Sequence, residues 1–192
     1  MCHNALDRHV AAGKGGADCF LWEGNDVGRD KKMTYAQVLE EVCRLSNWLR
    51  AQGVKKGDAV SIYMPMLCEL PIAMLACARI GAVHSVVFGG FSAEALAQRV
   101  EDCKARVLIT CSGVKRGDKR IGLKSIADEA VRLCAGRGHE VARVLVCEND
   151  NGLPKAETPF DASGGRDGWW QDEVSAHAPT AEVEWVDAEH PL

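Results

Sequence analysis

The sequence lacks a long run of apolar residues. Its most apolar stretch, residues 67–88, is interrupted by Glu69, Arg79 and His84, whereas a membrane-crossing helix needs about 20 consecutive apolar residues. A charged segment followed by an apolar run is also missing at the N-terminus, because residues 7–9 are Asp, Arg and His. The sequence therefore predicts neither contact with a membrane nor a secretory signal peptide.

An excess of basic charge is missing too. Lysine and arginine number 23 against 27 aspartates and glutamates, for a net charge of −4. A nucleic-acid-binding surface usually needs a basic stripe, so nucleic acid is excluded as an expected partner.

Several catalytic motifs are absent. There is no G-x-x-x-x-G-K-[ST] loop, and the glycine pair at residues 89–90 lacks the third glycine of a dinucleotide fingerprint. A nicotinamide-dependent oxidoreductase is therefore excluded. No Ser-His-Asp set, pair of catalytic carboxylates or cluster of metal ligands stands out, so we assign no catalytic residue and no metal ligand.

The nine cysteines form no C-x-x-C pair, and their number is odd. Most lie within apolar patterns, which favours free thiols packed as small core residues over a disulfide framework or a metal site. Free thiols favour a reducing compartment. We therefore expect a cytoplasmic protein, with an organelle matrix as the alternative.

Hydrophobic periodicity indicates an α/β fold with a parallel sheet covered by helices. Residues 1–33 are expected to be irregular apart from one short strand at 17–23, and residues 34–148 to form the α/β subdomain. Residues 149–192 are expected to be an irregular connecting segment, with a short helix that begins at residues 169–170. Within the subdomain, apolar spacing and capping residues predict helices near 34–53, 68–80, 92–103 and 123–133, and strands at 59–64, 82–88, 106–110 and 141–147.

Two stretches resemble core motifs of the adenylate-forming acyl-CoA synthetase family. They are residues 33–38 (MTYAQV) and residues 75–84 (LACARIGAVH). Residues 62–66 (IYMPM) and 86–92 (VVFGGFS) are similar to the acetate–CoA ligase (acetyl-CoA synthetase) branch of that family. The resemblance covers nearly the whole chain and implies that it is the first part of the large N-terminal domain of an adenylate-forming enzyme.

The resemblance also implies the chemistry. Enzymes of this branch convert acetate and ATP to acetyl-AMP and pyrophosphate, and CoA then displaces AMP to give acetyl-CoA. CoA, ATP and acetate are thus the expected small-molecule substrates, and Mg²⁺ is expected on residues outside this chain. A propionate or acetoacetate CoA ligase is the nearest alternative, and a non-catalytic CoA-binding or interaction module is the alternative from another class.

The best candidate site is the polar loop after the third strand. Arg116, Gly117, Asp118 and Lys119 lie in a run with several cations, at the carboxyl end of a parallel strand, where ligands bind in such folds. Arg116 is suited to a bidentate phosphate contact and Lys119 to a point-charge contact, while Gly117 allows a close backbone approach. From spacing alone, a solvated turn is the competing interpretation. The resemblance implies that these four residues contact CoA near its nucleotide phosphates.

A second candidate is the pair Gly89 and Gly90, between a strand and the helix that Ser92 is expected to cap. Two glycines there allow unusual dihedral angles or close approach of a ligand. The competing interpretation is a tight strand-to-helix turn. The resemblance implies that the segment lies beside the CoA adenine.

Other polar residues are better explained by packing. His84 is expected to be a satisfied core or interface histidine. Trp169, Trp170 and Arg166 are expected to pack the later segment onto the domain rather than to stack on a ligand.

The phosphate-gripping loop of the family, rich in Ser, Thr and Gly, does not occur in the sequence. In relatives it follows a segment that residues 189–192 resemble. We therefore expect this chain to be an N-terminal fragment, with the C-terminal portion of the enzyme as its missing partner. Without that portion it should release no pyrophosphate above background from ATP and acetate.

Overall fold

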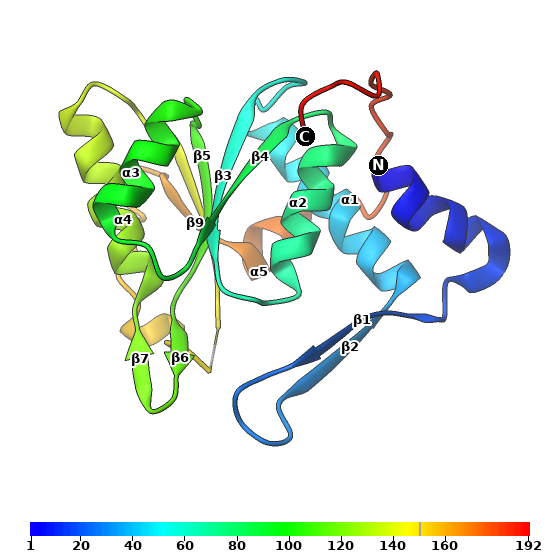
Figure 1. Cartoon of the computed structure of the whole chain (residues 1–192), viewed down its shortest axis with the longest axis horizontal. Coiled ribbons are helices and arrows are strands. Elements are labelled where there is room, and N and C mark those ends of the chain that lie inside the picture. The colour runs from blue at the N-terminus through cyan, green and yellow to red at the C-terminus, as the bar shows by residue number, and fades with distance from the viewer. Residues whose placement is uncertain (150) are drawn as a thin grey trace. The chain divides into compact units, whose positions relative to one another are not determined.

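The computed structural model describes residues 1–149 and 151–192, and it contains two compact units (Figure 1). Unit 1 consists of residues 1–58, 67–83 and 174–192, and unit 2 consists of residues 59–66 and 84–173. Both units are therefore assembled from segments that are separated in sequence.

Unit 2 is built on a five-stranded sheet. Its strand order is β4 (Val83–Phe88), β3 (Ala59–Met64), β5 (Val107–Cys111), β8 (Arg143–Cys147) and β9 (Asp167–Trp169). The pairs β3–β5, β5–β8 and β8–β9 are parallel. Every residue of β5 is buried, as expected for a strand covered on both faces. The predicted α/β class and parallel sheet are confirmed.

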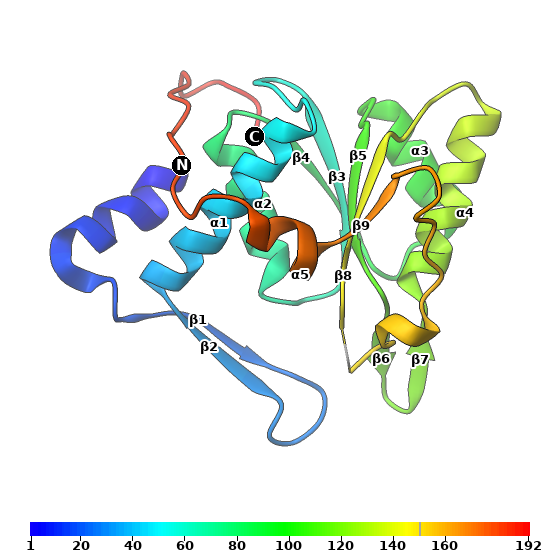
Figure 2. The same cartoon turned by 180° about the vertical axis from the view of Figure 1, so that it is seen from behind.

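Two helices of unit 2, α3 (Ala93–Asp102) and α4 (Leu123–Gly136), lie side by side against one face of this sheet in both views (Figures 1 and 2). The predicted cap of α3 is confirmed, because the Ser92 hydroxyl accepts a hydrogen bond from the Ala95 N–H at 3.3 Å. A side-chain cap of this kind satisfies one of the donors that the first helical turn leaves free.

Unit 1 contains α1 (Tyr35–Ala51) and α2 (Glu69–Arg79), which pack together. The capping box predicted for α1 is confirmed. The Gln37 N–H donates to the Thr34 hydroxyl at 3.3 Å, and the Gln37 side-chain oxygen accepts from the Thr34 N–H at 2.9 Å. The apolar stripe of α1 is buried, including Trp48 at 1% exposure.

The first 33 residues are more ordered than predicted. The strand expected near 17–23 is β1 (Asp18–Glu23), but it pairs antiparallel with a second strand, β2 (Asp30–Thr34), and short helices η1 (His3–Asp7) and η2 (Val10–Lys14) precede it. The expectation of an irregular segment was therefore wrong. The glycines that suggested irregularity separate short elements from one another, and Gly28 takes a φ of 79° between the two strands.

The segment after β8 contains one predicted helix together with elements that periodicity did not reveal. They are η3 (Lys155–Glu157), β9, the short helix α5 (Trp170–Glu173), close to where one was predicted, and η4 (Val174–Ala176). Residues 177–192 contain no helix or strand, as predicted. The turn predicted at residues 149–152 includes residue 150, which lies outside the described residues.

No helix among the described residues is long and apolar enough to cross a membrane. The nine cysteines are free thiols, and most are buried. Burial raises the pKa of Cys77 to about 12, so this thiol is held in its neutral form.

A fully buried ammonium group organises unit 2. The Lys124 side chain has no exposure, and its Nζ lies 2.6 Å from Asp128 Oδ1 and 2.7 Å from Asp167 Oδ2. Arg166 reaches the same two carboxylates at 3.0 and 2.7 Å. Since Lys124 and Asp128 belong to α4 and Asp167 begins β9, these pairs attach the helix to the edge of the sheet.

A buried guanidinium group holds separate segments of unit 1 together. Arg79, at the end of α2, makes two 2.9 Å hydrogen bonds to the Asp7 carboxylate and donates through Nε and Nη2 to the Ala181 carbonyl at 3.0 and 2.7 Å. The group is 4% exposed. It therefore joins the N-terminal helix η1 and the 177–192 segment to α2.

Helix α1 adds a row of donors to the same segment. Arg44, Asn47 and Arg50, at successive intervals of three residues, donate to backbone carbonyl groups between Ser175 and Glu182. Because this stretch forms no β-pair with any residue that the structure describes, these side chains satisfy carbonyl groups that a neighbouring strand would have paired.

Replacing Arg79 by alanine should destabilise unit 1 by about 2–3 kcal/mol, because the half-buried Asp7 carboxylate and Ala181 carbonyl would lose their charged donor. Equilibrium urea unfolding measures the loss. Arg132→Ala is the control, since Arg132 forms an exposed pair with Glu129, and it should leave the unfolding midpoint close to that of the wild type. Equal midpoints for the two variants would contradict the prediction.

Unit 2 should lose stability in acid through Asp167. Burial alone would raise the pKa of this carboxyl, but hydrogen bonds from Arg166 and Lys124 outweigh burial and hold it below its ordinary 3.8. A depressed pKa stabilises the fold above the unfolded-state value, and the stabilisation is lost as the pH falls through the folded-state value. Urea midpoints at pH 6 and pH 3 should therefore differ less in Asp167→Asn than in the wild type, and an unchanged difference would exclude this role.

Candidate functional site

The glycine pair that follows β4 lies at the edge of the sheet where β3 also ends. Gly89 is buried, and a Cβ placed on it would lie 3.2 Å from Leu123 Cδ1 and 3.5 Å from the carbonyl carbon of Met64. Met64 is the last residue of β3. The two strands therefore end together, and neither Gly89 nor Gly90 has a positive φ.

Gly90 brings the two predicted site segments together. A Cβ on Gly90 would lie 2.7 Å from the Phe88 ring and 3.0 Å from Arg116 Nη2. The Arg116 guanidinium carbon itself lies 5.2 Å from the centroid of the Phe88 ring, within the range of a cation–π contact. The absence of a side chain at residue 90 is thus what allows ring and guanidinium to meet.

The loop that carries Arg116 is a β-hairpin, which the sequence did not predict. Strands β6 (Val114–Arg116) and β7 (Lys119–Ile121) pair antiparallel, with Arg116 opposite Lys119. Gly117, the first residue of the two-residue turn, has a φ of 56°, which suits the type II′ turn of a short hairpin. The turn conformation therefore accounts for Gly117, and close approach of a ligand there stays a prediction.

The predicted residues of the hairpin are accessible. Arg116, Gly117, Asp118 and Lys119 are all exposed, and a Cβ on Gly117 would meet no atom within 4 Å. Pairing across the hairpin places Arg116 and Lys119 at the same level. The structure thus groups Arg116, Lys119 and Gly90, while their role in binding a ligand stays a prediction.

An exposed aromatic surface completes the candidate site. Phe88 and Phe91 are 61% and 39% exposed, and their rings meet edge to face with centroids 6.4 Å apart. Arg99 of α3 lies over the Phe91 ring at 4.5 Å. These rings were not predicted from the sequence to form part of a site, although two phenylalanines on either side of a glycine pair are a usable signal for a stacking surface.

A buried tyrosine fixes the turn beneath this surface. The Tyr63 hydroxyl donates to the Phe91 carbonyl at 2.8 Å, and the Tyr63 carbonyl accepts from the Thr110 hydroxyl at 2.9 Å. Burial raises the pKa of Tyr63 to about 12, so the hydroxyl remains protonated and able to donate. The backbone of residue 91 is therefore fixed to the core of the sheet.

Arg116 differs in its partner from six other arginines of the described chain. Within residues 1–149 and 151–192 its contact is the Phe88 ring, with no carboxylate beside it. Six other arginines form ion pairs with carboxylates: Arg79, Arg106, Arg132, Arg137, Arg143 and Arg166. An exposed guanidinium that lacks an acidic neighbour and lies on an aromatic face is suited to bind an anion carrying a planar ring.

Of the side chains expected to serve in packing, the tryptophans agree with the prediction and His84 does not. Trp170 is 4% exposed, and Trp169 stacks on Phe160 with centroids 4.9 Å apart, so packing of this segment is confirmed. His84 differs from the expectation, because its Nδ1 is buried and has no hydrogen-bond partner in the described part of the chain. Burial lowers the pKa of His84, so the ring favours its neutral form.

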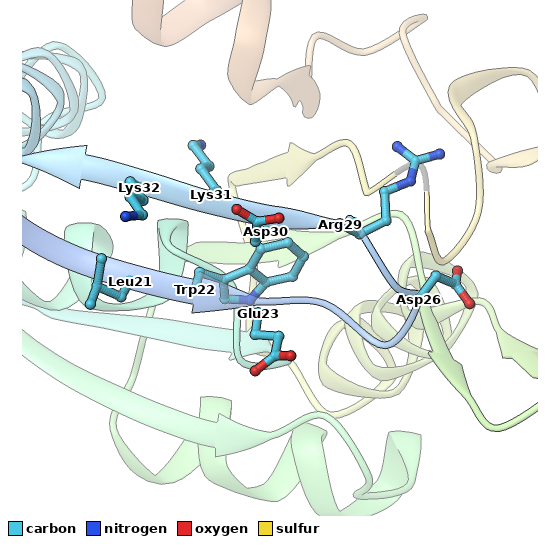
Figure 3. Close-up of a pocket in the computed structure, with 9 residues that line it drawn as sticks. Leu21, Trp22, Glu23, Asp26, Arg29, Asp30, Lys31 and Lys32 are labelled. Carbon is cyan, nitrogen blue, oxygen red and sulfur yellow. The ribbon is translucent and has the colours of Figure 1, made fainter.

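A surface hollow of about 340 Å³ lies elsewhere, along the β1–β2 hairpin of unit 1. Figure 3 shows Trp22 and Lys31 on the paired strands, with Asp26 and Arg29 near the hairpin tip. None of the predicted site residues lines it, and Lys31 is paired with Glu69 at 3.2 Å. Its open position and mixed charge do not match the predicted chemistry, so the residues around Arg116 remain the candidate site.

Gly90→Ala should displace Phe88 and Arg116 while leaving stability within about 0.5 kcal/mol of the wild type, because both neighbours are exposed and can move. NMR signals of the Phe88 ring and the Arg116 side chain should shift. Gly164→Ala is the control, since a Cβ there meets nothing within 4 Å and its φ is not positive. Unchanged Phe88 and Arg116 signals in Gly90→Ala would show that the three groups do not meet.

Comparison with solved structures agrees with this fold. A chain of acetoacetyl-CoA synthetase from Streptomyces lividans superposes with a TM-score of 0.81 at 23% sequence identity, covering 98% of this chain and 27% of that one. At this level of identity the likeness concerns the fold alone.

Sequence relatives are closer. The chain is 54% identical over 192 residues to the chloroplastic/glyoxysomal acetyl-coenzyme A synthetase of Arabidopsis thaliana, and 47% identical over 204 aligned residues to acetyl-coenzyme A synthetase of Drosophila melanogaster. It spans 26% and 30% of the lengths of these proteins. Residues 7–192 match the sequence profile described as "AMP-binding enzyme", and the chain therefore belongs to the AMP-binding enzyme family.

Proposed function

We propose that this chain supplies part of the coenzyme A site of an AMP-forming acetate–CoA ligase. The observation that carries the proposal is the position of Arg116 over the exposed Phe88 ring, beside Gly90. The relatives described as acetyl-coenzyme A synthetases support acetate as the acid.

Coenzyme A combines an adenine ring with a 3′-phosphate and a diphosphate. Phe88 and Phe91 offer aromatic faces for the ring, and a base stacked on an aromatic side chain gains about 1–3 kcal/mol. Arg116 would bind a phosphate through two N–H groups, and Lys119, opposite it on the hairpin, would add a second charge. Gly90, which is exposed, would offer its backbone to the adenine edge, with the buried Gly89 behind it. The turn residues Gly117 and Asp118 would border the phosphates.

In the proposed reaction, an acetate oxygen attacks the α-phosphorus of ATP and releases pyrophosphate, giving acetyl-AMP. The CoA sulfur then attacks the acetyl carbonyl carbon, the C–O bond to AMP breaks, and acetyl-CoA and AMP leave. The share of this chain is to bind and orient CoA for the second step, which lowers the entropic part of the barrier.

The groups for the first step are assigned to the part of the relatives that lies beyond the matched quarter to third of their length. ATP would bind to that C-terminal portion, which would pack against this chain in the full enzyme. The described residues bring together no group of His, Cys, Asp or Glu side chains that could hold a metal ion, so no residue here is assigned to Mg²⁺. The free thiols support a reducing compartment, in the cytoplasm or an organelle matrix.

Calorimetric titration with CoA tests the proposal. Arg116→Ala should weaken CoA binding about 10–100-fold, the effect of losing a hydrogen bond to a charged group. Raising the salt concentration should weaken binding to the wild type more than to the variant, because screening acts on the charge that the variant lacks. Dephospho-CoA, which lacks the 3′-phosphate, shows which phosphate Arg116 contacts.

Arg132→Ala is the matched control, because it removes an exposed arginine of unit 2 whose partner is Glu129. This variant should bind CoA like the wild type. Equal CoA affinities of Arg116→Ala and Arg132→Ala would remove Arg116 from the site, and no heat of CoA binding to the wild type would reject the proposed function for this chain.

A further inference from the structure

The β6–β7 hairpin is too short to hold its own orientation. Each strand has three residues, and an isolated two-stranded hairpin is at best marginally stable in water. Its tip nevertheless carries Arg116 to the Phe88 ring. Contacts at the root of the hairpin must therefore fix its direction.

One such contact comes from Asn149, just after β8. Its N–H donates to the Ser112 hydroxyl at 2.9 Å, and its side-chain Nδ2 donates to the Gly113 carbonyl at 2.8 Å. Ser112 is fully buried, and its own N–H donates to the Cys147 carbonyl at 2.8 Å. Both residues that lead from β5 into the hairpin are thus fixed to the end of β8.

A second contact is a backbone-to-backbone approach. A Cβ on Gly152 would overlap the carbonyl group of Gly113, and it would lie 2.6 Å from the Val114 nitrogen. From the other side, a Cβ on Gly113 would lie 2.7 Å from the Ile121 carbonyl oxygen and 2.9 Å from Leu153 Cβ. Neither glycine has a positive φ, so lack of space is what requires glycine at both positions.

We propose that Asn149 and Gly152 are positioning residues for coenzyme binding. They fix the root of the β6–β7 hairpin so that Arg116 stays over Phe88, and they act on the ligand only through Arg116. This role rests on the proposed function. It also assigns a task to residues that follow β8, far along the chain from the residues that contact the ligand.

Hydrogen exchange tests directly whether Asn149 and Gly152 fix the root of the hairpin. Gly152→Ala should raise exchange of the hairpin amides, residues 114–121, about tenfold or more, while the amides of β5 and β8 keep their protection. Gly136→Ala is the matched control, because a Cβ there meets nothing within 4 Å and its φ is not positive. Asn149→Ala is the milder second variant, since it removes one side-chain bond and keeps the backbone bond to Ser112.

CoA titration then tests the positioning role. Asn149→Ala should weaken CoA binding about fivefold, as expected for loss of one hydrogen bond, and Gly152→Ala at least as much. Both effects should disappear in an Arg116→Ala background, because residues that act through Arg116 do not add to its loss. A merely structural role would give additive losses. Asn47→Ala, which removes comparable bonds from unit 1, should leave CoA affinity unchanged.

The outcomes separate this inference from the function on which it rests. If the wild type binds CoA and both variants bind it equally well, the positioning role is wrong and the proposed function stands. Losses that add to that of Arg116→Ala also overturn it. If the wild type binds no CoA, the proposed function and the positioning role fail together. The exchange data still show whether Asn149 and Gly152 hold the hairpin.

Discussion

The buried ammonium group of Lys124 is the constraint on which unit 2 depends most. An unpaired charge cannot remain in a protein interior, because its desolvation costs several kcal/mol. Lys124 must therefore keep both Asp128 and Asp167 within reach, and this requirement ties the first turn of α4 to the start of β9. The β6–β7 hairpin ends at Ile121, directly before α4. The C-terminal end of the hairpin thus leads into a helix that the charge network holds, and its N-terminal end is fixed by the contacts around Asn149.

In unit 1, Arg79 is the buried charged group that connects separate segments. The stretch near Ala181 has no strand partner among the described residues, so its carbonyl groups need donors from side chains. Arg79 and the donors of α1 supply them. The environments of Arg79 and Arg116 differ in the partners that surround each guanidinium group. Arg79 is neutralised by Asp7 and held on several sides, whereas Arg116 lies on an aromatic face and remains exposed. The first arrangement stabilises a fold, and the second leaves a charge available to a ligand.

Elements with strong periodicity could be predicted from the sequence. The caps at Thr34 and Ser92 predicted where two helices begin, and the apolar strands predicted most of the parallel sheet. Strands β6, β7 and β9 could not be found, because they have three residues each and carry charged residues or glycine, so neither alternation nor an apolar run marks them. The N-terminal strands were obscured for a related reason, since the glycines that separate them resemble those of an irregular segment.

The candidate site was predictable in its parts but not in its assembly. The cations of the Arg116 loop and the glycine pair were visible in the sequence, yet their meeting depends on β3, β4 and β5 ending at one edge. The glycines show why. A sequence does not distinguish a glycine needed for its φ from one needed for space, and close approach was expected at Gly117. The structure gives Gly117 the turn conformation and gives the tight contact to Gly90, where ring and guanidinium meet. The same criterion makes Gly152 a spatial requirement, and a substitution that leaves its backbone angles unchanged would still force its backbone apart from that of Gly113 at the root of the hairpin.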